Sequence, residues 1–63
     1  MSIELVEASD GSLLPLGSLA HAYYDEPGGG YSTDTVVHAG VTYVQTTTFS
    51  GADTTTSKWM RQP

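Results

Sequence analysis

The sequence lacks cysteine, has few basic and few large aliphatic residues, and contains no long apolar run. Without cysteine, a chain of 63 residues has neither disulfides nor thiolate metal ligands to stabilise it. Leu, Ile, Val and Phe make up about 19 % of the residues, close to the composition of disordered chains. Because a domain of this size buries only roughly 60 % of its unfolded surface, we expect the missing stability to come from association.

The charge is strongly one-sided. Only Lys58 and Arg61 oppose seven acidic residues, for a formal net charge of −5. This balance predicts that the protein binds neither nucleic acid nor anionic membranes, because both require a basic surface. The first residues are acidic where a secretory signal is basic, so we expect synthesis in the cytosol.

Residue types from position 31 onward are typical of strands, with Thr, Val and aromatic residues between glycine-containing turns. Strands are expected at residues 19–26, 31–38, 41–49 and 54–61. The predicted fold class is all-β: a small antiparallel meander of three to four strands with an extended N-terminal arm. The arm comprises residues 1–18, in which residues 3–6 are compatible with a short strand, and the meander domain comprises residues 19–63.

Two-residue loops at 39–40 and 51–52 predict a definite strand register. The cross-strand rows would be Val36, Tyr43 and Met60; Thr35, Val44 and Trp59; Asp34, Gln45 and Lys58; and Thr33, Thr46 and Ser57. Similar side chains meet in each row, which favours this register. Both sheet faces are then half apolar and half threonine, and an isolated sheet of this kind is not expected to be stable alone.

The leucines of the N-terminal half have no regular period, and two placements remain open for them. They cover one face of their own sheet, or they lie on a neighbouring subunit and add a strand there. The candidate interface residues are Leu13, Leu14, Leu16, Leu19, Val36, Tyr43, Trp59 and Met60.

Residues suited to catalysis or metal binding are sparse. His21 and His38 lack the further ligands that zinc requires. The glycines at 28–30 follow Asp25 and Glu26, without the lysine of a phosphate loop or the spacing of a calcium loop. A thin sheet of this size is unsuited to enclosing a catalytic triad in a cleft that excludes water. We therefore predict no enzymatic activity, no metal and no cofactor.

The aromatic residues have two readings, as the core of a small sheet or as a sugar-stacking surface formed by Tyr31, Tyr43 and Trp59. The second reading has support from a motif. A Tyr, a Val, Gly-x-x-Tyr and a closing Trp preceded by Ser resemble the small chitin-type carbohydrate-binding modules, on Tyr31, Val36, Gly40, Tyr43, Ser57 and Trp59. This resemblance implies a glycan as the ligand.

A second resemblance covers about three quarters of the chain. Residues 17–19, 33–36, 40–46, Gly51 and 57–62 resemble the C-terminal portions of short virion proteins of tailed bacteriophages, including Tyr-Val-Gln-Thr and Ser-x-Trp-x-x-Gln. It implies a non-enzymatic structural component of the virion, such as a capsid decoration, fibre or tail accessory protein. The implied partners are further copies of the chain, as a homotrimer, and a larger virion protein.

Overall fold

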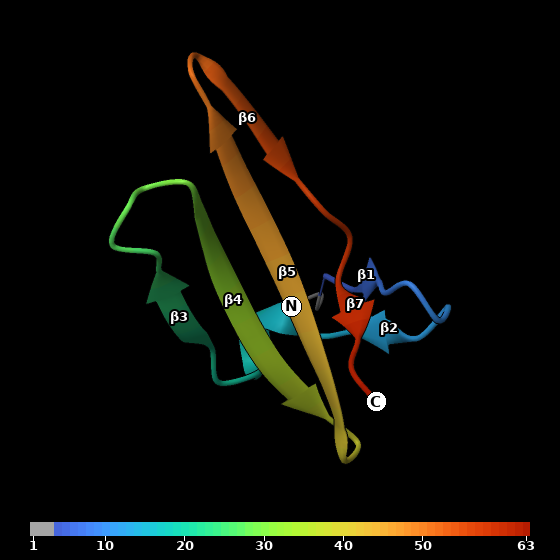
Figure 1. Cartoon of the computed structure of the whole chain (residues 1–63). Coiled ribbons are helices and arrows are strands. Elements are labelled where there is room, and N and C mark those ends of the chain that lie inside the picture. The colour runs from blue at the N-terminus through green and yellow to red at the C-terminus, as the bar shows by residue number, and fades with distance from the viewer. Residues whose placement is uncertain (1–3) are drawn as a thin grey trace.

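The computed structural model describes residues 4–63, which form an all-β fold, as the sequence predicts (Figure 1). Its elements are β1 (Val6–Glu7), β2 (Leu13–Leu14), the 3-10 turn η1 (Leu16–Ser18), β3 (Ala22–Asp25), β4 (Tyr31–His38), β5 (Val41–Ser50), β6 (Asp53–Thr56) and β7 (Met60–Arg61). Of the predicted N-terminal strand, Ile3 lies outside the described residues and Val6 begins β1. No helix in the described part is long and apolar enough to cross a membrane.

The main sheet is an antiparallel meander in the order β3-β4-β5-β6, and β7 pairs with β5 after β6. The predicted register between β4 and β5 is confirmed: Val36 faces Tyr43, and the pairs on either side follow. The connecting turn is Ala39–Gly40, with φ of 53° and 78°. Positive φ at both central residues is the geometry of the tight turn whose twist matches a hairpin.

The last predicted strand, residues 54–61, is interrupted. Thr47 faces Thr56, but Val44 faces Met60, so three residues of the last segment oppose two of β5. This extra residue is a β-bulge. Ser57 closes it: its N–H donates to the Thr46 carbonyl at 2.8 Å, and its Oγ accepts from the Thr46 N–H at 3.0 Å.

The bulge makes the predicted register wrong beyond β6. Because a shift of one residue turns each side chain to the other face, Trp59 lies on the face of Val36 and Tyr43 rather than with Val44. Met60 moves to the opposite face, and Lys58 does not join the row of Asp34 and Gln45. A continuous strand would have left Trp59 outside the core that it now completes.

The core lies between residues 4–19, which we call the N-terminal segment, and one half of one face of the main sheet. Five residues are buried in this core: Ala8, Leu14, Val36, Tyr43 and Trp59. Four partly buried residues pack against them: Val6, Leu16, Leu19 and Val41. The Ser9 N–H donates to the Trp59 carbonyl at 2.8 Å, and the Arg61 N–H donates to Ser9 Oγ at 3.1 Å. Of the two placements considered, the segment therefore covers its own chain's sheet.

Figure 1 shows that this cover is partial. The hairpin of β1 and β2 lies beside β7, whereas the end of the β5–β6 hairpin extends away from it. All four residues of β6 are exposed. The covered half of the face is apolar, and the remainder is open to solvent.

Two adjacent leucines test this packing. Leu14 is fully buried and Leu13 is 53 % exposed. We expect Leu14→Ala to lower the free energy of unfolding by about 2–5 kcal/mol, because it leaves a cavity in the core. Leu13→Ala is the matched control and should change it by no more than about 0.5 kcal/mol. Urea denaturation followed by circular dichroism measures both, and equal losses would contradict the observed packing.

Candidate functional site

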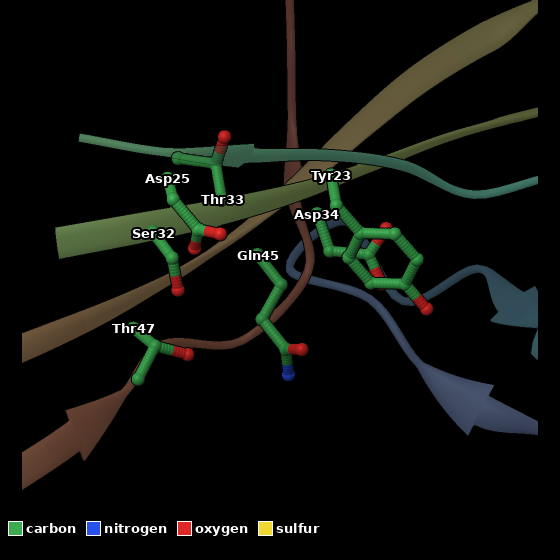
Figure 2. A pocket seen from close by; sticks show the side chains of 7 residues that line it. All are labelled: Tyr23, Asp25, Ser32, Thr33, Asp34, Gln45 and Thr47. Atoms are coloured by element: carbon green, nitrogen blue, oxygen red, sulfur yellow. The ribbon is translucent and has the colours of Figure 1, made fainter. Parts of the chain in front are cut away.

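A polar groove of about 270 Å³ lies on the part of the sheet face that the N-terminal segment leaves open. Strand pairing places its residues in two cross-strand rows. Tyr23 faces Asp34, which faces Gln45, and Ser32 lies between Asp25 and Thr47. Figure 2 shows these six side chains together with Thr33. The groove therefore combines one aromatic ring with two carboxylates, an amide and hydroxyl groups.

His21 connects the groove to the N-terminal segment. Its Nε2 donates to the Leu16 carbonyl at 2.8 Å, and its Nδ1 lies 2.7 Å from Asp34 Oδ2. Since the carbonyl can only accept, a ring that donates to both partners is the imidazolium. The Leu16 carbonyl, and next the Asp34 carboxylate, raise the pKa of His21 above its ordinary value. Contacts through both ring nitrogens thus link η1 to β4.

The surroundings of His21 are aromatic. Its ring stacks on Tyr23, with centroids 5.8 Å apart, and meets the edge of Trp59 at 6.1 Å. The other carboxylate oxygen of Asp34, Oδ1, is buried and has no hydrogen-bond partner among residues 4–63. The groove thus contains an acceptor that the described side chains do not use.

Asp10 links the N-terminal segment to β5 and β7 of the main sheet. Its Oδ1 accepts from the Ser12 N–H at 3.0 Å, and its Oδ2 accepts from the Tyr43 hydroxyl at 3.0 Å. Arg61 Nη1 lies 3.4 Å from the same Oδ2. The Ser12 N–H is the main cause that lowers the pKa of Asp10, and Tyr43 and Arg61 act in the same direction. The hydroxyl of Tyr43 is therefore already engaged within the chain.

The opposite face of the sheet has no cover among the described residues. We call it the open face, and strand pairing assigns fourteen residues to it: Ala22, Tyr24, Tyr31, Thr33, Thr35, Val37, Thr42, Val44, Thr46, Thr48, Ser50, Asp53, Thr55 and Met60. The Tyr24 and Tyr31 rings lie 6.3 Å apart at one end. There the Tyr24 hydroxyl donates to Glu26 Oε2 at 3.0 Å, and hydrogen bonding to the same carboxylate raises the pKa of Tyr31.

The predicted interface residues are divided between core and surface. Leu14, Val36, Tyr43 and Trp59 are buried in the core, Leu16 and Leu19 pack against it, and Leu13 and Met60 are exposed. Half of this set is therefore occupied within the chain itself.

The predicted sugar-stacking residues are not brought together. Tyr43 and Trp59 are 2 % and 3 % exposed, whereas Tyr31 is 40 % exposed on the opposite face. Tyr23, which lies over the groove, was not among the predicted residues. The signal that points to it is its position two residues before Asp25 on a strand that pairs with Asp34 and Ser32.

Among residues 4–63, no three His, Cys, Asp or Glu side chains gather in a way that would hold a metal ion. Comparison with known proteins finds no matching family model, no similar curated protein and no similar solved structure.

The geometry of His21 gives a pH dependence. Because its folded pKa is raised above 6.5, its contribution to stability is fully present below about pH 6.5 and is lost as the pH rises through the folded pKa. We expect the free energy of unfolding, measured in urea, to fall over this range in the natural chain and to fall much less in His21→Gln. His38→Gln is the matched control and should keep the full decrease. A His21→Gln profile as steep as that of the natural chain would refute the assignment.

Proposed function

We propose that this chain is a non-enzymatic structural component of a tailed-phage virion, a capsid decoration, fibre or tail accessory protein. In this proposal it works by associating with further copies of itself, three being the favoured number, and by docking on a larger virion protein. Its working location is the virion, after synthesis in the host cytoplasm.

The observation that carries the proposal is the balance of buried and exposed hydrophobic residues. Five hydrophobic residues are buried, whereas eight large ones are exposed: Leu5, Leu13, Tyr23, Tyr24, Tyr31, Val37, Phe49 and Met60. Single exposed hydrophobics are ordinary, but four of these share the open face. A shared apolar surface is typical of an interaction site.

Two exposed leucines of the N-terminal segment suit the proposed docking on a larger virion protein. Leu5 and Leu13 are each about half exposed, while Leu14 beside them is buried. They lie on the segment that covers the other sheet face, so a body docked there leaves the open face free. Self-association and docking therefore use separate surfaces.

Sedimentation tests the first part of this proposal. We expect the purified chain to sediment as an oligomer across the micromolar range, because association supplies the apolar burial that a chain of this size lacks. We also expect the chain to co-purify with phage particles from infected cells. A well-folded monomer at micromolar concentration would refute the proposed function.

A carbohydrate-binding module is the second candidate, and the groove is the observation that favours it. The Tyr23 ring is 76 % exposed beside Asp25 and Asp34. An aromatic face packs against the apolar face of a sugar ring, and carboxylates accept hydrogen bonds from its hydroxyls. This arrangement differs from the sugar-stacking set predicted from the sequence, because it lies on Tyr23 rather than on Tyr43 and Trp59.

Adjacent tyrosines give a matched test of this candidate. Tyr23 lies over the groove, and Tyr24 lies on the open face. If the groove binds glycan, insoluble chitin should retain the natural chain and Tyr24→Ala, and should retain Tyr23→Ala at least about tenfold less, the ratio expected for a lost stacking contact. Chitin that fails to retain the natural chain, or that retains both variants equally, would remove this candidate.

A further inference from the structure

We propose that copies of this chain associate through the open face. This inference rests on the self-association in the proposed function and specifies the surface at which it occurs. The other sheet face is unavailable for this role, because the N-terminal segment covers its apolar half and the groove fills the rest with polar groups. The open face runs across β3, β4, β5, β6 and β7, and it includes Val37, which is 57 % exposed.

Charge favours a second copy as the occupant. The chain carries a formal charge of −5, so two copies repel each other wherever their acidic groups meet. Asp53 is the one carboxylate among the fourteen residues of the open face, and it and the nearby Glu26 both lie toward the end of the sheet where Tyr31 faces Thr48. Asp25 and Asp34 point to the other face. This is therefore the sheet face on which copies approach with the least repulsion.

The polar groups of the open face are complementary to themselves. Apart from Asp53, they are the hydroxyls of six threonines, one serine and two tyrosines, and a hydroxyl both donates and accepts. An interface built only from open faces pairs residues of this face with one another, so each polar group must be satisfied by another group of the same face. Hydroxyls meet this condition, whereas a face of carboxylates or of amines does not.

The size of the open face suits a weak contact between copies. Its strands β3, β4, β5, β6 and β7 comprise 28 residues, and at about 3.3 Å of length and 4.8 Å of width per residue they cover roughly 440 Å² per copy. A pair would bury about 900 Å², which lies in the range of weak, transient interfaces. In a trimer the three open faces would turn toward the threefold axis, and each copy would contact two neighbours.

Adding like charge to this face tests the inference. We expect Val37→Glu and Thr46→Glu each to weaken self-association at least about tenfold, measured by sedimentation equilibrium, because the new carboxylates meet in the interface. Thr54→Glu is the matched control. It adds the same charge at an exposed strand position that pairs with Phe49 on the other face, and it should leave association within about twofold of the natural chain.

The outcomes separate this inference from the function on which it rests. If the natural chain is a monomer, the proposed function fails. If the natural chain associates and both open-face variants associate equally well, self-association stands and the open face is the wrong surface. Circular dichroism of each variant confirms that the sheet is intact, and Val37→Glu is suited to this because its side chain is mostly exposed before association.

Discussion

The burial of Trp59 against Leu14 and Val36 is the contact on which the rest of the structure depends. It requires the bulge at Ser57, since in an unbulged strand of the same sequence the indole would point to the opposite face. It also requires the N-terminal segment, whose Leu14 closes the core from above. Strand register and docking of the N-terminal segment are therefore coupled, because the first places Trp59 on one side of the core and the second places Leu14 on the other. The core is too small for either side to be stable without the other.

The meander was predictable from particular residues. Ala39–Gly40 and Gly51 mark turns that set the register of β4 with β5 and of β5 with β6, because two-residue loops leave no freedom in pairing. The bulge was not predictable from the sequence. In it the Thr46 N–H donates to the side chain of Ser57 rather than to a backbone carbonyl, and a serine that follows a run of threonines gives no local signal for this. Its consequence was a wrong face for both Trp59 and Met60.

The groove was only partly foreseeable. The pairing of Asp34 with Gln45 follows from the first turn, so two of its polar side chains were placed correctly. The contact of His21 with Asp34 depends on where the segment between η1 and β3 returns to the sheet, which residue pattern alone does not determine. The same holds for Asp10, whose partners lie 33 and 51 positions away in the sequence. Long-range polar contacts of this kind require the folded backbone.

The bulge also determines where this protein tolerates changes in chain length. A residue added to the connection at 27–30 alters a solvent-exposed turn and leaves every strand pair in place. A residue removed between β6 and β7 would leave two residues opposite two of β5, so the flanking pairs, Thr47 with Thr56 and Val44 with Met60, would keep their places and Trp59 would stay in the core. The bulge thus absorbs the loss of one residue without turning Trp59 to the other face, so homologous sequences should vary in length at the glycine-rich turn and by one residue in this interval.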